Sequence, residues 1–245
     1  MAADNAPDPR RTQAPPPITL LEIQVSTLFR CDAFGRLMSL NEPASPVAPR
    51  FFLGRTYGGN LLRLRHDLPR DLVKEIEKLV EREPLPYALK DPPREQFAIV
   101  HALRRHNAVI DVHRGPAYAF LRPIPGVAGV VLLGPTRAPH LHPALATLAT
   151  ELASRQPCFA AVEDGVAVSA CYSARIGAQA AEAGVETAEA YRGRGLATRV
   201  VAAWAAAVRE QGLLPLYSTS WDNLASQAVA RHLGLEPYAE NWHIG

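Results

Sequence analysis

A glycine-rich turn at residues 192–197, Arg-Gly-Arg-Gly-Leu-Ala, constrains the fold of this chain more than any other segment. It follows a short strand-like segment, 184–187, and opens a long stretch rich in alanine and valine that is typical of a helix. The first amides of a helix have no intrahelical acceptor, and the helix dipole adds partial positive charge there. The segment therefore predicts a strand, a turn and a helix whose N-terminus binds phosphate.

Two other phosphate-binding motifs fit this turn poorly. The dinucleotide fingerprint needs a third glycine where Thr198 stands, and an acidic residue at the end of the next strand, whereas 216–220 carries no carboxylate. The nucleoside-triphosphate loop needs Gly-Lys-Ser/Thr, a tripeptide that this sequence lacks.

The order of elements around the turn is well marked. Asp164-Gly165 is typical of a hairpin turn between strands at 158–162 and 166–173. After strand 184–187 we expect a helix over 196–211 that Gly212 ends, and then a strand over 216–220. A helix starting at Asp222 or Asn223 ends near Gly234, and a last strand starts within 235–238.

The pattern Arg-x-x-Gly-x-Ala at 192–197, with Asn223-Leu-Ala-Ser226 downstream, resembles the acyl-coenzyme A segments of the GNAT superfamily, the general-control-type N-acetyltransferases. The strand and helix order from Cys158 onward is also that of the C-terminal two thirds of the GNAT fold. The resemblance implies an α/β fold with a mixed, mostly antiparallel sheet flanked by helices, behind an N-terminal accessory α+β region.

This resemblance implies acetyl-CoA as co-substrate and a set of residues that bind it. Backbone amides near Val185 and Thr187 would face the thioester and pantetheine, and the turn would bind the pyrophosphate. Asn223 and Ser226 would contact the pantetheine or phosphate arm, although ordinary helix capping also explains Asn223. The full implied set is Val185, Thr187, Arg192, Gly193, Arg194, Gly195, Leu196, Ala197, Asn223 and Ser226.

Glu186 is the candidate general base. A carboxylate within a buried strand is costly unless it is paired or used, and strand alternation puts Glu186 on the same face as Gly184. We expect Glu186 to accept the amine proton, directly or through water. A salt bridge to Arg175, or to an arginine of the N-terminal region, is the alternative.

The proton donor for the leaving thiolate is harder to name. GNAT enzymes often carry a tyrosine four residues before the glycine that ends the last helix, and here that position is Ala230. Tyr217 and Tyr238 are the candidate acids, with Tyr172 as a further substitute. The alternative for each of these tyrosines is an ordinary aromatic residue in the core or at its rim.

The predicted function is acetyl transfer from acetyl-CoA to a primary amine, by direct attack in a ternary complex. The acceptor is a small molecule or a peptide amine, and the sequence does not choose between them. The alternative is a non-catalytic, regulatory module that binds acyl-CoA, which Ala230 favours.

Composition limits the other function classes. The net charge of +2 argues against a nucleic-acid partner, and the longest apolar run, 200–208, is too short to span a bilayer. Three cysteines at unrelated spacings and scattered histidines suggest neither disulfides nor a metal site. We therefore expect a cytoplasmic protein without a metal, and a homodimer is compatible with the sequence.

Three regions are expected along the chain: a disordered tail (1–17), an accessory or remodelled N-terminal region (18–115) and a GNAT-like acyl-CoA-binding domain (116–245). Residues 18–29 fit a helix or a strand, and 61–64 fit a strand. A helix capped by Asp67 should follow and end before Pro84. A second should span 93–106 with Phe97, Val100 and Leu103 facing inward.

Overall fold

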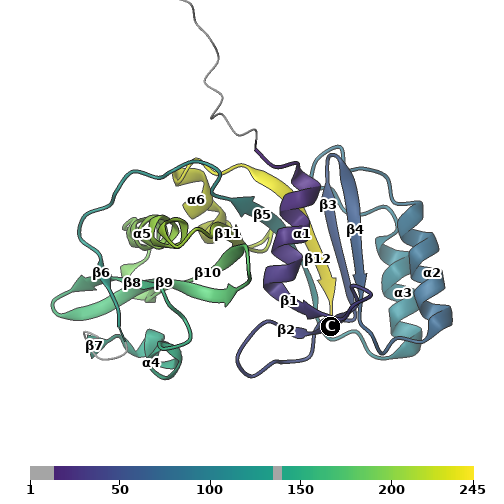
Figure 1. The fold of residues 1–245 in the computed structure, drawn as a ribbon, viewed down its shortest axis with the longest axis horizontal. Helices are drawn as coiled ribbons and strands as arrows, with labels where there is room; N and C mark the ends of the chain where they lie inside the picture. Colours follow the sequence, from purple (N-terminus) through teal and green to yellow (C-terminus); the bar gives the residue numbers. More distant parts are fainter. Residues whose placement is uncertain (1–13, 135–139) are drawn as a thin grey trace, which may run out of the picture.

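A single long sheet runs through this protein, whose structure is a computed structural model that describes residues 14–134 and 140–245 (Figure 1). The strand order is β4-β3-β12-β5-β11-β10-β9-β8-β6, and all of these neighbours are antiparallel except β10 and β11. Helices lie on both faces, so the expected mixed, mostly antiparallel α/β fold is confirmed.

The C-terminal half follows the predicted order. The hairpin β8 (Cys158–Glu163) and β9 (Val166–Ile176) turns at Asp164-Gly165 and leads to β10 (Ala180–Thr187), which starts earlier than predicted. Then come α5 (Leu196–Glu210), β11 (Leu214–Ser218), α6 (Leu224–His232) and β12 (Pro237–Ile244).

The N-terminal half contributes strands to the same sheet. Helix α1 (Pro17–Leu28) settles the choice left open for 18–29. It is followed by β1 (Phe29–Cys31), β2 (Leu37–Leu40), β3 (Phe51–Thr56), β4 (Gly59–Leu64), α2 (Arg70–Glu81), α3 (Gln96–His106) and β5 (Val112–Ala119). Strand β3 had no clear sequence signal, and the proposed boundary at 115 and 116 stays a prediction, with β5 running across it.

Short elements join β5 to β8. They are β6 (Val131–Leu132), β7 (His140–Leu141), a 3-10 turn η1 (Pro143–Leu145) and α4 (Ala146–Glu151). The turn η2 (Glu189–Tyr191) follows β10.

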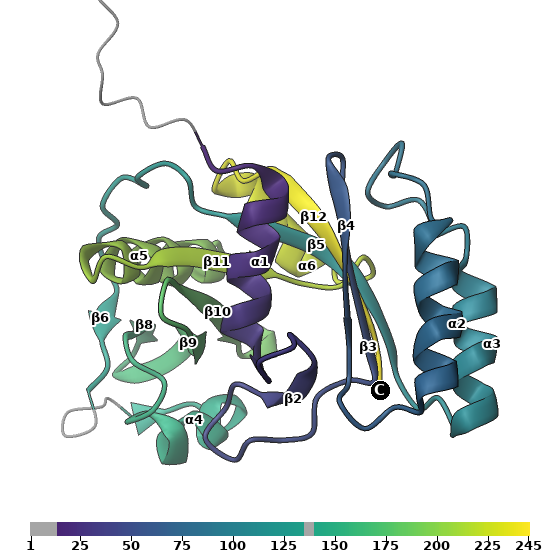
Figure 2. The same cartoon turned by 45° about the vertical axis from the view of Figure 1, so that its right-hand side comes forward.

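Two helices cover opposite faces of the sheet centre. Helix α1 crosses one face, as Figures 1 and 2 show, and α5 packs on the other. Neighbouring strand residues divide between the two cores: Ala180 and Leu216 lie in the α1 core, while Ala181 and Tyr217 lie in the α5 core. This alternation is the period-two pattern of a sheet that is buried on both faces.

Helices α2 and α3 cover the end of the sheet at β3, β4 and β12, and correct two predictions. Pro69 precedes α2 with no side-chain cap, and Asp67 instead pairs with Arg65 at 2.7 Å. Phe97 is 86% exposed, because the inward face of α3 is Ile99, Ala102 and Leu103. Leu103 faces inward as predicted and Val100 is partly buried against the same core, so only Phe97 was placed on the wrong side.

A buried ionic cluster ties the two halves together. The Glu240 carboxylate on β12 accepts from Arg55 on β3 at 2.6 Å and from Arg114 on β5 at 2.6 Å. It also accepts from the Trp221 indole at 2.8 Å. Since both oxygens are used, burial of the charge is compensated, and the segment leading into α6 is fixed in place.

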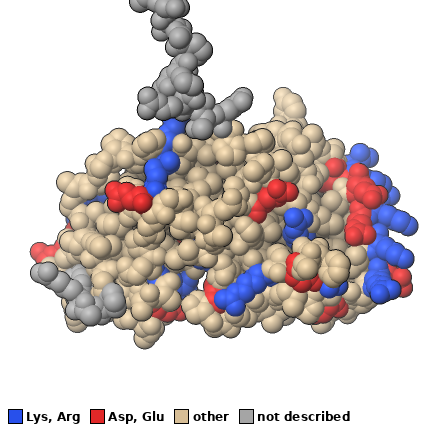
Figure 3. All heavy atoms as spheres, in the orientation of Figure 1, with Lys and Arg blue, Asp and Glu red and all other residues tan. Residues whose placement is uncertain are grey.

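Charges are distributed unevenly over the visible surface. In the orientation of Figure 3, basic and acidic side chains intermingle most densely at the right-hand end, where Figure 1 places α2 and α3. Among the described residues, none of the helices combines the length and apolar character needed to cross a bilayer.

Candidate functional site

The sheet opens at its centre, where β10 and β11 diverge. Their parallel pairing ends at Glu182 and Leu216, whereas β10 stays paired with β9 as far as Thr187. Residues 183–187 of β10 therefore have no ladder partner on the β11 side. Such an opening leaves backbone donors and acceptors free to bind a ligand.

A cavity of about 740 Å³ lies at this opening, a volume typical of small-molecule sites. It is bounded by the end of β10, the turn before α5, Tyr217 of β11 and one face of α6. Of the ten residues predicted to bind the cofactor, nine line it: Val185, Thr187, Arg192, Gly193, Gly195, Leu196, Ala197, Asn223 and Ser226.

The glycine turn has the backbone form that the motif predicts. Gly193 and Gly195 have φ angles of 75° and 74°, a region that disfavours side chains, and no atom lies within 4 Å of a Cβ built on either. Among the described hydrogen bonds, the first within α5 runs from the Arg199 amide to the Gly195 carbonyl. The amides of residues 196–198 thus lack intrahelical partners and sit at the cavity wall.

The arginines of the turn have separate roles. Arg192 lines the cavity, and its Nε donates to the Thr187 carbonyl at 3.3 Å. Arg194 lies outside the cavity lining, because it pairs with Glu163 at 2.7 Å. Arg199 donates to the carbonyls of Ala128 and Gly129. Arg192 is therefore the arginine of this turn best placed to meet an anion in the cavity.

Asn223 and Ser226 are held by capping at the start of α6. The Asn223 Oδ1 accepts from the Ser226 amide at 3.0 Å, which is the capping bond expected at this spacing. Both residues also line the cavity, so capping and ligand contact are compatible.

Glu186 lines the cavity, and its carboxylate is not in an ion pair with Arg175. Arg175 instead pairs with Glu42, from the segment after β2. The Glu186 Oε1 accepts from the Tyr172 hydroxyl at 2.6 Å, and among the described residues no donor reaches Oε2. The arrangement leaves one carboxylate oxygen for a ligand.

The candidate acids are separated by the structure. Tyr217 lines the cavity, whereas the Tyr238 hydroxyl donates to Gln24 at 2.7 Å within the core beneath α1. Burial raises the pKa of Tyr217 to about 12. Ala230 is fully buried against α5.

Cys171 is unsuited to nucleophilic chemistry. It is fully buried in the α5 core, and burial raises the pKa of its thiol well above the ordinary range. A thiol that stays protonated is inert. Within the described residues, no group of three His, Cys, Asp or Glu side chains could hold a metal ion.

Sequence reasoning missed part of the wall contributed by α6. Ala225, Ala228, Val229 and His232 line the cavity, and their spacing of three, four and seven residues places them on one helix face. That spacing was available as a signal once α6 was expected to border the ligand. The other unpredicted lining residues are Ala144, Glu189, Tyr191 and Thr198.

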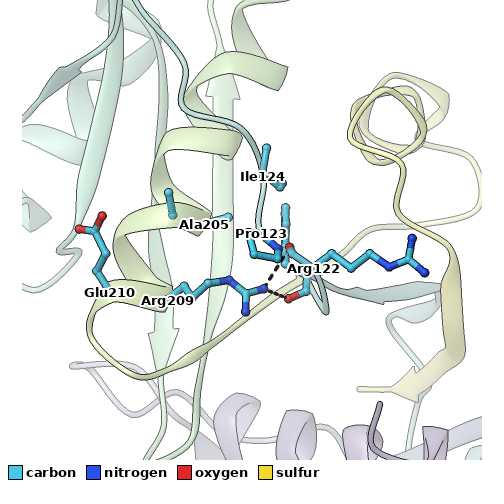
Figure 4. Close-up of a pocket in the computed structure, with 8 residues that line it drawn as sticks. Arg122, Pro123, Ile124, Ala205, Arg209 and Glu210 are labelled. Atoms are coloured by element: carbon cyan, nitrogen blue, oxygen red, sulfur yellow. Dashed lines mark hydrogen bonds between the residues drawn. The ribbon is translucent and has the colours of Figure 1, made fainter. Parts of the chain in front are cut away.

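A second cavity, of about 250 Å³, lies between α5 and the segment after β5. Arg209 reaches across it and donates to the carbonyls of Phe120 and Arg122, while the Arg122 side chain extends away (Figure 4). These bonds hold the 120–124 segment against α5. None of the predicted site residues lies there.

Comparison with known proteins finds a family similarity in the C-terminal part of the chain. Residues 153–242 match the family model described as GNAT acetyltransferase. This match covers the hairpin, the glycine turn and both helices that border the large cavity. The search of curated proteins gave no match.

Several solved acetyltransferases share low similarity with the chain. A putative GNAT acetyltransferase from Novosphingobium aromaticivorans is 21% identical, with 56% of this chain and 66% of that chain covered and a TM-score of 0.44. A GCN5-related N-acetyltransferase from Kribbella flavida is 21% identical, with coverages of 60% and 63% and a TM-score of 0.40. The chain thus covers just under two thirds of the length of each of these two proteins.

A GNAT acetyltransferase from Colwellia psychrerythraea aligns over more of the chain. It is 15% identical, with 94% of this chain and 96% of that chain covered and a TM-score of 0.42. All three similarities lie below 25% identity and below a TM-score of 0.5, so the similarity to a family rests on the match of the family model to residues 153–242.

Proposed function

We propose, on the premise that residues 153–242 belong to the GNAT acetyltransferases, that this protein transfers an acetyl group from acetyl-CoA to a primary amine. The observation that carries the proposal is one cavity that joins four features: the free amides of the glycine turn, the unpaired end of β10, Glu186 and Tyr217. The family supports acyl transfer in general, and the residues of this chain support the finer assignment.

The residues present fit an acyl-CoA. The glycine turn offers open space where side chains would stand and several unpartnered amides, which suit a pyrophosphate. Arg192 adds positive charge beside it. The free strand edge at 183–187 offers backbone groups to the amide-containing pantetheine arm. Asn223 and Ser226 complete the opposite wall.

Glu186 and Tyr217 supply the acid–base chemistry. A bound acyl thioester provides an activated carbonyl carbon and a sulfur that leaves as the new C–N bond forms. Glu186 accepts a proton from the amine nitrogen at its free Oε2, directly or through water. Tyr217 gives its hydroxyl proton to the departing sulfur, taking the role that Ala230 cannot fill. Both groups attach to strands at the point where the sheet opens.

Acetyl-CoA binding and turnover test the proposal separately. Calorimetry should detect acetyl-CoA binding, and thiol release should rise with added amine across a panel of small amines and peptides with free N-termini. The variant E186Q should keep binding and lose most turnover, by about 100-fold or more. Binding without thiol release for any amine would support the alternative, a non-catalytic acyl-CoA-binding module. Absence of binding by the folded protein would refute both.

A further inference from the structure

Tyr172 and Gly184 lie directly opposite each other on β9 and β10. A Cβ atom on residue 184 would lie 2.5 Å from Cε2 and 2.8 Å from Cζ of the Tyr172 ring. The ring therefore crosses β10 in the space where any other residue at 184 would place its side chain. Glycine at this position is a requirement of the contact, because real Cβ atoms do not approach so closely.

The crossing brings the Tyr172 hydroxyl to Glu186. Two residues along a strand share a face, so Glu186 is the next side chain beyond Gly184 on that face. The hydroxyl donates to Glu186 Oε1 at 2.6 Å, which is a short, charge-assisted bond when the carboxylate is ionised. Tyr172 itself does not line the cavity.

The Tyr172 ring is fixed by its surroundings. It packs against the core cluster that contains Leu145, Leu148 and Leu152. The Arg155 guanidinium lies 5.7 Å from the ring centre and pairs with Glu151 at 3.0 Å. A ring packed against these groups delivers its hydroxyl to one place, so the Glu186 carboxylate is restrained at Oε1 while Oε2 remains available.

We propose that Tyr172 is a positioning residue, which holds Glu186 Oε1 and so orients the carboxylate toward the cavity with Oε2 available to accept a proton. This inference rests on the proposed function for its catalytic meaning. The contact between the two side chains, and its effect on the carboxylate, stand independently of it. Tyr172 acts through Glu186 and does not touch the substrate.

Tyr172 is suited to be a permanent donor. Burial, with a further contribution from Glu186, raises the pKa of the Tyr172 hydroxyl, so the proton stays on the tyrosine across the range of any assay. A permanent donor restrains the carboxylate that accepts from it, because a charge-assisted hydrogen bond is short and directional. Removing the hydroxyl therefore releases the Glu186 carboxylate from the orientation in which Oε2 receives the amine proton.

Other charged groups lie around Glu186 on several elements, and a test must separate them from Tyr172. Those facing the same cavity or packed against the tyrosine are Glu189, Arg192, His232, Glu151 and Arg155. The substitution Tyr172→Phe leaves all of them in place and removes a single oxygen atom.

The experiment compares wild type, Y172F and G184A by two readouts. Carbon-13 NMR at one fixed pH records the chemical shift of the Glu186 carboxyl without substrate, with the signal assigned by its loss in E186Q. Steady-state turnover gives kcat and KM separately. In Y172F the Glu186 carboxyl signal should move, and kcat should fall about 10-fold with KM nearly unchanged, the loss expected when a proton acceptor is no longer held in position. G184A, which displaces the ring but keeps the hydroxyl, should change both readouts in the same direction.

Y238F is the matched control, because it deletes another buried tyrosine hydroxyl, one that donates to Gln24 outside the cavity. The Glu186 carboxyl signal and kcat should both stay at the wild-type values in Y238F. An unchanged Glu186 signal in folded Y172F would overturn the inference. A moved signal in a protein that releases no thiol would uphold the contact and count against the proposed function instead.

Discussion

The Tyr217 hydroxyl lies 2.5 Å from the Ser226 Oγ. This contact joins β11, just past its last pairing with β10, to the first turn of α6 at the cavity. Tyr217 comes from a strand, whereas the tyrosine that the resemblance implies would come from α6. Ser226 has its own amide held by Asn223. The hydroxyl pair therefore has a fixed position on two elements.

Replacing Tyr217 with Phe should lower kcat by about 10- to 100-fold, at the lower end of general-acid effects, because a thiol with a pKa of about 8.5 leaves readily as an anion. Stopped assays of thiol release would measure kcat, and calorimetry would show acetyl-CoA affinity close to wild type. The exposed Tyr57 provides the control Y57F. A wild-type kcat in Y217F would remove Tyr217 from the acid role.

The pH profile offers a second check on Tyr217. Burial raises the pKa of Tyr217 to about 12, so the hydroxyl keeps its proton well above neutrality. We therefore expect that ionisation of Tyr217 causes no decline in the wild-type kcat up to about pH 10. Any decline in that range should also be seen in Y217F. A basic limb that disappears in Y217F would contradict this assignment.

Gly115 on β5 should be intolerant of alanine. A Cβ there would lie 1.7 Å from the Thr219 carbonyl oxygen and 2.7 Å from the Ser220 Cα, and both are backbone atoms. G115A should destabilise the protein by about 3 kcal/mol, the upper part of the range for overpacking. It should also weaken acetyl-CoA binding, because the displaced segment leads into Asn223. Urea unfolding and calorimetry would measure the two effects.

Gly126 supplies the control for that prediction. No atom lies within 4 Å of a Cβ built on Gly126, so G126A should unfold at nearly the wild-type urea concentration. Equal midpoints for G115A and G126A would show that the close approach at Thr219 relaxes without cost.

His243 should make stability depend on pH below neutrality. Its ring stacks on His113 with centroids 4.6 Å apart, and burial, then the His113 charge, lower its pKa to about 4. The unfolded chain binds a proton near pH 6.5, so folding stability falls as the pH drops from about 6.5 to 4. Because His243 is partly exposed, screening reduces the full effect to about 2 kcal/mol.

The variant H243Q removes this titration. The stability difference between wild type and H243Q, measured by urea unfolding at several pH values, should shrink as the pH falls from 7 to 4. The exposed His101 of α3 gives the control H101Q, which should run parallel to wild type. Parallel curves for wild type and H243Q would contradict the prediction.

Glu182 should produce the opposite slope. It is 3% exposed, and burial raises the pKa of its carboxyl, against the lowering effect of donors from Ser218 and Gln24. The folded state thus holds the proton more tightly than the unfolded state. Stability should fall as the pH rises from the ordinary glutamate value of about 4.3 through the raised folded value.

The variant E182Q tests this sign. Its stability relative to wild type should increase with pH across that window and then level off, as followed by urea unfolding. The exposed Glu77 of α2 gives the control E77Q, for which no such trend is expected. A relative stability of E182Q that stays flat or decreases with pH would show that the fold does not disfavour the ionised carboxyl, and would contradict the prediction.

The sequence by itself determined those elements that short turn and capping motifs mark. Asp164-Gly165 between two alternating runs defined the hairpin, and the glycines at 193 and 195 defined the turn before α5. Nine of the residues predicted to bind the cofactor line one cavity, because they belong to a few short segments with strong turn and capping chemistry. Phe97 was misplaced because a short amphipathic helix leaves its phase open by one or two residues.

Only the tertiary structure decided which distant residues meet. The sequence alone gave Tyr172 no link to Glu186, because their contact depends on the register of β9 with β10 and on the space above Gly184. It likewise left Tyr217 and Tyr238 as equal candidates, although one faces the cavity and the other Gln24. Strand pairing fixes the register and the face of residues that lie far apart in the sequence, and local propensity does not determine that pairing.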